Sequence, residues 1–213
     1  GFAVLEELAQ KAAATDLVVI MDAKRGDIGT TMDAYFDAWL GRTAPFVCDA
    51  LTVSPYLGFD SLKDVMSESL ERGKGLFVLA ATSNPEGRQV QRAKTGELSV
   101  AADIYSSLEA ANKVNVEANS RIGSFGAVVG ATLNLSAFGL GSIQSDASQL
   151  TPILAPGFGA QGAKLADTRD LFGASAHRVL ASVSRSVLSV GPAQIVNAID
   201  SAKAELAAGL SHG

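Results

Sequence analysis

The sequence predicts an α/β fold built around a parallel sheet, and three observations lead to this class. Short apolar, β-branched runs alternate with longer helical patterns along the 213 residues. Four of these runs are almost continuously apolar, which is typical of parallel strands covered on both faces. Polar side chains follow the carboxyl ends of several different strands, and this favours a (β/α)8 barrel over a doubly wound sheet.

The predicted elements follow one another in regular order. A leading helix is expected over Phe2–Ala13, and Thr30 and Asp33 have the spacing of a capping box for the next helix. The expected strands are Asp16–Ala23, Phe46–Val53, Gly75–Ala81, Gly126–Ala131, Pro152–Ala155 and His177–Val183. The expected helices that follow them are Thr31–Leu40, Ser61–Arg72, Leu98–Ile122, Ser136–Gln149, Ala163–Phe172 and Gln194–Leu210.

The number of βα units is too small for a closed barrel. Six βα units are visible in 213 residues, whereas a (β/α)8 barrel has eight units and typically needs about 250 residues. A doubly wound nucleotide-binding sheet would carry G-x-G-x-x-G after its first strand, and that pattern does not occur there. We therefore expect residues 1–213 to form a single barrel domain that holds strands 3–8 and lacks the first two strands. The helical pattern that starts at Gly1 agrees with an N-terminally incomplete barrel.

Composition argues against several classes of function. An apolar content of 47% excludes disorder, and no run of about 18 apolar residues predicts a membrane-spanning helix. The net charge of −5 and the absence of a basic stretch argue against nucleic-acid binding. A single cysteine, Cys48, can form neither an internal disulfide nor a multi-cysteine metal site, and no spacing of ligands indicates zinc. A cytoplasmic protein without membrane or nucleic-acid partners is expected.

The densest group of charged residues lies at the end of the first predicted strand, where residues 22–31 are DAKRGDIGTT. Asp22 and Lys24 are two positions apart, so on a regular strand they share one face at a spacing of roughly 7 Å. Gly26 permits a turn that moves Asp27 out of this line. A lysine ammonium beside carboxylates suits proton donation or the binding of an anion. An ordinary salt bridge at a strand end is the alternative interpretation.

Two further segments at strand ends predict a phosphate site. Residues 156–162 are PGFGAQG, whose glycines let backbone N–H groups approach an anion, and Gln161 adds an amide. Ser184 and Arg185 follow the last predicted strand, and barrels frequently bind phosphate with the loops after strands 7 and 8. Arg185 is then a bidentate phosphate ligand. Ser83, after the third predicted strand, is a candidate for hydrogen-bonding a polar edge of the ligand.

Nucleophilic catalysis is not indicated. No nucleophile elbow occurs, and neither histidine is placed for a catalytic triad. His177 is expected to open the last strand at the end of the barrel that serves stability, and His212 lies in the tail. Cys48 and Trp39 are expected in the core.

These motifs resemble those of the orotidine 5′-phosphate decarboxylase family. The family signature D-x-K-x-x-D-I stands here as Asp22, Lys24, Asp27 and Ile28, with Thr31 four residues after the last Asp. The resemblance continues through SNP at 83–85, PGFGAQG at 156–162 and SR at 184–185, and it covers essentially the whole chain. The run at residues 22–31 is similar to that of a bacterial subgroup with longer members. The D-x-K-x-x-D core alone is shared with related sugar-phosphate lyases.

The resemblance implies a homodimeric barrel that converts orotidine 5′-monophosphate to UMP in pyrimidine biosynthesis, with no cofactor and no metal. Lys24 would donate a proton to C6 of the ring, and Asp27 and Thr31 would reach the site of the neighbouring subunit. The implied catalytic residues are Lys24, Asp22 and Asp27. The implied substrate-binding residues are Ile28, Thr31, Ser83, Pro156, Gln161, Ser184 and Arg185.

Two alternatives remain open from the sequence. The first is a related phosphosugar lyase or decarboxylase that uses the same frame with Mg²⁺, although Ile28 and the Thr30–Thr31 pair favour the orotidine phosphate interpretation. The second is a non-catalytic fragment that binds a nucleotide phosphate. It is considered because the family carries an Asp on its first strand and a Lys on its second, and neither strand precedes Gly1.

Overall fold

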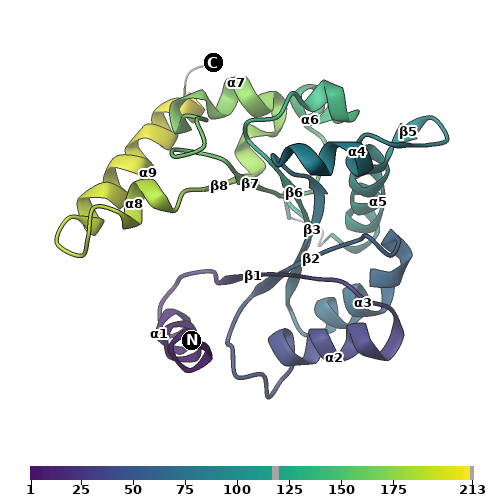
Figure 1. Ribbon diagram of the computed structural model, residues 1–213, viewed down its shortest axis with the longest axis horizontal. Helices are drawn as coiled ribbons and strands as arrows, with labels where there is room; N and C mark the ends of the chain where they lie inside the picture. Colours follow the sequence, from purple (N-terminus) through teal and green to yellow (C-terminus); the bar gives the residue numbers. More distant parts are fainter. Residues whose placement is uncertain (117–119, 212–213) are drawn as a thin grey trace. The chain divides into compact units, whose positions relative to one another are not determined.

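The computed structural model describes residues 1–116 and 120–211, and it confirms the alternation of strands and helices (Figure 1). The chain divides into two compact units. The first contains Gly1–Leu79 and Ser124–Gly126, and the second contains Ala80–Gly123 and Ala127–Gly213.

The first unit holds three parallel strands and the helices between them. Strand β1 pairs with β2, and β2 pairs with β3, both in parallel. All four residues of β2 are buried, which explains why this run is apolar on both faces. The elements are α1 (Phe2–Ala13), β1 (Ile20–Arg25), α2 (Gly29–Leu40), β2 (Ala50–Val53), η1 (Phe59–Leu62), α3 (Lys63–Glu71) and β3 (Gly75–Ala81).

The second unit holds β7, β8 and the last three residues of β6, with β6 paired to β7 and β7 paired to β8 in parallel. All five residues of β6 are buried. Its strands and α-helices are α4 (Arg88–Gln91), β4 (Lys94–Thr95), β5 (Leu98–Ser99), α5 (Val100–Asn115), β6 (Phe125–Val129), α6 (Ser142–Ser145), β7 (Ile153–Pro156), α7 (Thr168–Phe172), β8 (Val179–Ser182), α8 (Arg185–Leu188) and α9 (Ile195–Ser211). Its 3-10 helices are η2 (Pro85–Gly87), η3 (Leu135–Phe138), η4 (Leu165–Asp167) and η5 (Gly173–Arg178).

The order of the strands distinguishes a barrel from a doubly wound sheet. Hydrogen-bonded neighbours follow the order β1-β2-β3-β6-β7-β8, which is the order of these strands along the chain. A doubly wound sheet reverses its strand order at a switch point, and no reversal occurs among these strands. The prediction of a (β/α)8-type fold is confirmed by six consecutive strands in barrel order.

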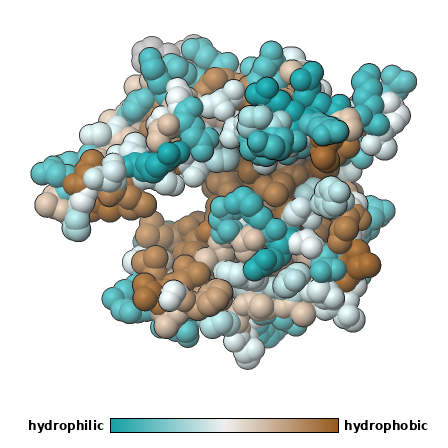
Figure 2. All heavy atoms as spheres, in the orientation of Figure 1, coloured by the Kyte–Doolittle hydropathy of each residue, from teal (hydrophilic) through white to brown (hydrophobic). Residues whose placement is uncertain are grey.

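Apolar side chains are exposed on the first helix. Phe2, Val4 and Leu8 of α1 are 72%, 68% and 62% exposed, and Figure 2 shows apolar surface over this helix. The core of the same unit lies instead beneath α2 and α3, where Phe36, Leu51 and Leu62 are fully buried.

Three predicted helices differ clearly from the structure. Ala163–Phe172 is the 3-10 turn η4 followed by the five-residue helix α7. Ser136–Gln149 is not one helix but η3 followed by α6, because Gly139 takes a left-handed conformation with φ 72° and ends the first turn. The predicted helix Leu98–Ile122 begins with β5, and its helical part ends at Asn115, after which Val116 is extended. Ser99 caps α5 by accepting a hydrogen bond from Ala102 N. Positions 117–119 of that prediction lie outside the described residues.

The predicted strand boundaries are also shifted. Strand β1 begins at Ile20, because Leu17 and Val18 are 66% and 73% exposed and take no part in the sheet. The part of Phe46–Val53 before Ala50 is a loop, although Phe46 is buried there. His177 lies in η5, where its Nδ1 contacts Ala174 O at 2.9 Å, and not at the start of β8.

Four smaller predictions concern individual residues. The capping box at Thr30 and Asp33 is wrong, because α2 already begins at Gly29 and its N-cap Ile28 makes no side-chain cap hydrogen bond. Cys48 is buried, as predicted, whereas Trp39 is half-buried. His212 lies outside the described residues.

Candidate functional site

The charged cluster of the first unit lies at the carboxyl end of β1. Lys24 Nζ forms an ion pair with Asp22 Oδ2, and the two side chains are 49% and 61% exposed. Thr52 Oγ1 donates a hydrogen bond to the other carboxylate oxygen, Asp22 Oδ1, at 2.9 Å. The sequence placed Asp22 and Lys24 on one face, and the structure brings their head groups together.

The backbone conformation at Lys24 differs from that of the regular strand that the sequence predicts. Lys24 has φ 50°, a left-handed conformation that no other non-glycine residue adopts within residues 1–116 and 120–211. The parallel pairing with β2 is irregular between Met21 and Arg25. A β-bulge therefore places the Lys24 side chain, and the two-residue period of an ideal strand does not apply here.

The rest of the signature turns away from β1 and enters α2. Gly26 lies so close to β2 that a Cβ atom there would be 2.3 Å from Ser54 O, which explains the glycine. Asp27 Oδ1 accepts a hydrogen bond from Ile28 N at 2.9 Å. Ile28 is 62% exposed and Thr31 is exposed on the first turn of α2. In the described part of this chain, no hydrogen bond or ion pair joins Asp27 to Lys24.

The second unit brings together side chains from two distant loops. Ser83 follows β3 and Gln161 follows β7, and Ser83 Oγ lies 3.4 Å from Gln161 Oε1, within hydrogen-bonding distance. Pro156 is the last residue of β7. Ser83 and Gln161 are 78 positions apart in the chain, and they meet because the carboxyl ends of parallel strands lie at the same end of the sheet.

The glycine-rich loop after β7 lies against the segment after β8. Gly157, Gly159 and Gly162 have φ of 119°, 71° and 107°, conformations that side-chain-bearing residues rarely adopt. A Cβ atom on Gly159 would lie 2.7 Å from Ser186 Oγ. The two segments that the sequence predicts for phosphate binding are therefore neighbours in the folded unit.

Ser184 and Arg185 stand at the start of a helix. The sequence predicts that Arg185 follows the last strand, and in the structure β8 ends at Ser182 and Arg185 is the first residue of α8. Ser184 O accepts hydrogen bonds from Val187 N and Leu188 N at 3.1 and 2.8 Å. The exposed Arg185 guanidinium makes no hydrogen bond or ion pair with any described residue, so it is available to an anion.

One cavity of the second unit lies beside these residues. A cavity of about 440 Å³ in the second unit is lined by Gly159, Gly162 and Ser186, but not by Ser83, Gln161 or Arg185. The larger part of its lining comes from η4, α8 and α9.

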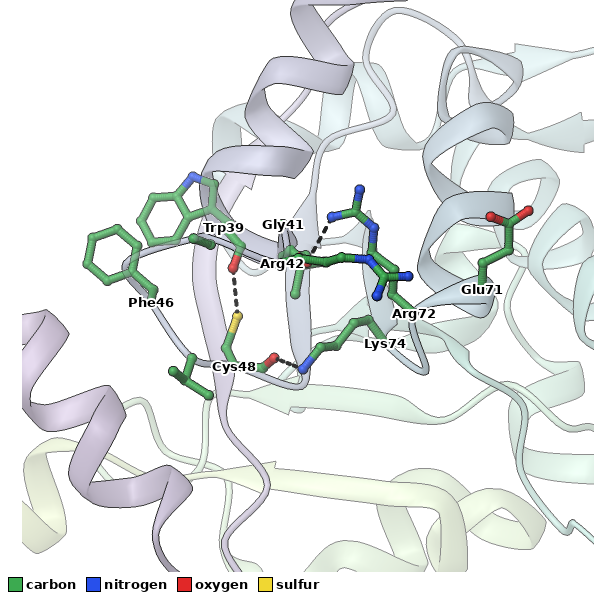
Figure 3. Close-up of a pocket in the computed structure, with 11 residues that line it drawn as sticks. Trp39, Gly41, Arg42, Phe46, Cys48, Glu71, Arg72 and Lys74 are labelled. Carbon is green, nitrogen blue, oxygen red and sulfur yellow. Dashed lines mark hydrogen bonds between the residues drawn. The ribbon is translucent and has the colours of Figure 1, made fainter.

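A cavity of about 420 Å³ in the first unit is shown in Figure 3. Its lining includes Trp39, Phe46 and Cys48, and Lys74 Nζ donates to Cys48 O at 2.6 Å. Burial raises the pKa of the Cys48 thiol to about 11, which keeps the thiol protonated and unreactive at neutral pH. Cys48 and Lys74 precede β2 and β3, whereas the charged cluster lies at the carboxyl end of β1. This cavity therefore lies at the amino ends of the strands, the end that serves stability in barrels.

Sequence reasoning missed three buried polar side chains that the structure makes prominent. Thr52 is a buried hydroxyl inside β2, and its one signal is a polar residue within an apolar run. Glu109 and Arg178 form a buried ion pair at 3.9 Å near the amino end of β7. Glu109 also accepts from Leu150 N and Thr151 N at 2.7 to 3.1 Å, which ties α5 to the sheet.

Two kinds of site are not found in the parts of the chain that are described. No group of three or more His, Cys, Asp or Glu side chains there is arranged to hold a metal ion. No described helix is both long enough and apolar enough to cross a lipid bilayer.

Together, the strand order and the polar groups at the strand carboxyl ends define a barrel protein of the (β/α)8 class, with a charged lysine–aspartate pair and candidate phosphate loops. The chain belongs to the orotidine 5′-phosphate decarboxylase / HUMPS family, whose model matches residues 1–198.

Individual relatives agree with this family. A Streptomyces coelicolor protein named orotidine 5′-phosphate decarboxylase is 52% identical over 194 residues, which are 90% of this chain. A protein of the same name from Nocardioides is 48% identical over 189 residues, 88% of this chain. The chain spans 66% of the length of each of these curated relatives.

Solved structures support the fold. A Streptomyces avermitilis crystal structure matches with a TM-score of 0.87 and 47% identity, covering 99% of this chain and 72% of that one. The structure of Leishmania donovani OMP decarboxylase matches with a TM-score of 0.70 and 26% identity, covering 99% of this chain and 75% of that one.

Proposed function

We propose that the protein containing this chain is a lyase that decarboxylates orotidine 5′-monophosphate to UMP in pyrimidine biosynthesis. The observation that carries the proposal is the Asp22–Lys24 pair at the carboxyl end of β1, inside the family signature. Curated relatives bearing the name of this activity support it. The Mg²⁺-dependent alternative has less support, since the Streptomyces coelicolor and Nocardioides relatives both carry the decarboxylase name.

The chemistry of the reaction suits a lysine paired with a carboxylate. The bond between C6 and the carboxylate carbon breaks, CO2 leaves, and the electron pair remains on C6 in an orbital that the ring cannot delocalise. The Lys24 ammonium stabilises this charge and then donates its proton to C6. Asp22 holds the ammonium in place, and its negative charge also opposes the substrate carboxylate before CO2 departs.

Substrate binding is assigned to the loops of the second unit. Ser83 and Gln161 hold the pyrimidine, with Pro156 at the start of the loop. Gln161 also reaches the phosphate, and the Arg185 guanidinium together with the backbone near Ser184 binds that phosphate. Binding energy from a remote phosphate can be used to organise the reacting end of the substrate.

We propose that the protein forms a homodimer in which Asp27 and Thr31 reach the site of the neighbouring subunit. The lack of a described contact between Asp27 and Lys24, and the exposure of Ile28 and Thr31, support this assignment. A cytoplasmic location follows from the proposed pathway. The net charge of −5 does not attract an anionic substrate. The attraction must therefore come from local cationic groups at the site.

The direct test is to incubate the natural gene product with orotidine 5′-monophosphate and to measure CO2 and UMP. Equal amounts of both, unaffected by EDTA, are expected. Complete loss of activity in EDTA would favour the Mg²⁺-dependent alternative. UMP binding without turnover would favour a nucleotide-phosphate-binding protein.

A further inference from the structure

Strand β1 contains more residues than its partner at the charged cluster. The paired positions are Met21 with Leu51 and Arg25 with Val53, so four steps along β1 match two steps along β2. Within this interval Thr52 is the one residue of β2, and it faces three residues of β1, among them Asp22 and Lys24. The bulge therefore removes the regular backbone partners from this stretch of β1.

The Thr52 side chain supplies partners where the ladder is interrupted. Its Oγ1 accepts a hydrogen bond from Lys24 N at 3.0 Å and donates one to Asp22 Oδ1 at 2.9 Å. Thr52 is fully buried, at 0% exposure, so water cannot easily replace these contacts. One hydroxyl thus binds the backbone of Lys24 and the carboxylate of Asp22 at the same time.

The backbone of Lys24 needs such a contact. Its φ of 50° lies in the left-handed region, which is unfavourable for a residue with a long side chain. A conformation of this kind persists where the surrounding structure holds it, and such positions cluster at functional sites. The hydrogen bond from Lys24 N to Thr52 Oγ1 is a side-chain contact made directly to this backbone.

We propose that Thr52 is a positioning residue for the Asp22–Lys24 pair, because its hydroxyl fixes the bulged Lys24 backbone and orients the Asp22 carboxylate. The proposal rests on the proposed decarboxylase function. Thr52 acts through its neighbours: when its hydroxyl is missing, Lys24 Nζ loses its fixed place relative to C6, while the phosphate contacts of the second unit are unchanged.

The activity test compares Thr52→Val with Thr52→Ser in the natural gene product. Valine keeps the shape of threonine and removes the hydroxyl, whereas serine keeps the hydroxyl. For Thr52→Val we expect kcat to fall about 10- to 100-fold, equivalent to about 1.4 to 2.7 kcal/mol in the barrier, with KM within about threefold of wild type. Thr52→Ser should retain kcat within about threefold of wild type, because its hydroxyl can make both hydrogen bonds.

Other kinetic results overturn the proposal. They are an unchanged kcat in Thr52→Val, a loss confined to KM, or equal losses in the valine and serine variants. If Thr52→Val does not fold, Thr52→Ala is measured by the same criteria, since alanine cannot crowd the site. If neither Thr52→Val nor Thr52→Ala folds while Thr52→Ser does, Thr52 serves stability alone, and this result would also overturn the proposal.

A crystal structure of the valine variant, or of the alanine variant if valine does not fold, separates this proposal from the proposed function. We expect Lys24 to leave the left-handed region or the Asp22 carboxylate to rotate away from its present position. If the Lys24 backbone and the Asp22 carboxylate are both unchanged in this structure, the positioning role is overturned even if kcat has fallen. If the wild-type protein releases no CO2 from orotidine 5′-monophosphate, the proposed function fails, and the positioning role is then decided by this structure alone.

Discussion

Lys24 combines an unusual backbone conformation with a charged side chain beside Asp22. Lys24 has a left-handed φ, and its ammonium pairs with Asp22 Oδ2. Neither group is buried deeply, at 49% and 61% side-chain exposure, so this surface pair adds little to stability. Its importance is expected in the reaction.

Removal of the Lys24 amine should abolish turnover. For Lys24→Ala we expect kcat to fall by at least about 10³-fold, because the proton donor for C6 is lost. Lys63→Ala is the matched control, since Lys63 also pairs with an aspartate, Asp60, at 2.8 Å and is 64% exposed. Release of CO2 measures both variants. Turnover near the wild-type rate in Lys24→Ala would refute its role as proton donor.

Arg185 should act on binding. Arg185→Ala is expected to raise KM for orotidine 5′-monophosphate about tenfold or more, because a charge-assisted hydrogen bond to phosphate contributes about 1.5 to 3 kcal/mol. Arg169→Ala, which removes an exposed arginine of the same unit, should leave KM unchanged. An unchanged KM in Arg185→Ala, measured by steady-state kinetics, would count against phosphate binding by this residue.

Among the elements, α5 is fixed to the sheet by buried charge. Glu109 of α5 accepts from two backbone amides at the amino end of β7 and lies 3.9 Å from Arg178, whose side chain is fully buried. Arg178 also donates to Gln149 Oε1 at 3.3 Å and to Thr151 O. The network joins α5, η5 and the loop before β7, all within the second unit.

Glu109→Ala should therefore destabilise the second unit. We expect the free energy of unfolding to fall by about 3 to 5 kcal/mol, because Arg178 would remain buried without its carboxylate partner. Lys113→Ala, an exposed change on the same helix, should alter stability by less than about 0.5 kcal/mol. Urea unfolding of the two variants checks the difference. Equal stabilities would show that the buried pair is dispensable.

For the whole molecule, the proposed dimer leads to a test that needs no structure of the assembly. If Asp27 serves the neighbouring subunit, a mixed dimer of Lys24→Ala and Asp27→Ala has one site with both residues intact and one site with neither. Two inactive variants, unfolded and refolded together, should regain about a quarter of wild-type activity, because about half of the dimers are mixed and each has one working site. Lys24→Ala refolded with itself is the control. No recovery would indicate that Asp27 serves its own subunit.

The sequence predicted much of this molecule because its signals were local. Apolar runs between helical patterns located the six strands of the main sheet, and the signal is clearest for β2 and β6, which are buried on both faces. The signature at residues 22–31 and the loop at 156–162 were recognisable because their glycines and charges are adjacent in the chain. The helix expected over Ser136–Gln149 was wrong, because the left-handed Gly139 interrupts a pattern that apolar spacing alone supports.

The sequence by itself determined the fold class, the family resemblance and the candidate residues from Asp22 to Arg185. Only the tertiary structure decided how Lys24 is held, because the bulge exists only when β1 pairs with β2 and a buried threonine 28 positions away bonds to it. The meeting of Ser83 with Gln161 and the buried Glu109–Arg178 pair were likewise settled by tertiary structure. Residues that are distant in the chain become partners through strand pairing and burial. Local sequence patterns do not predict those contacts, because each depends on two segments that meet only in the folded protein.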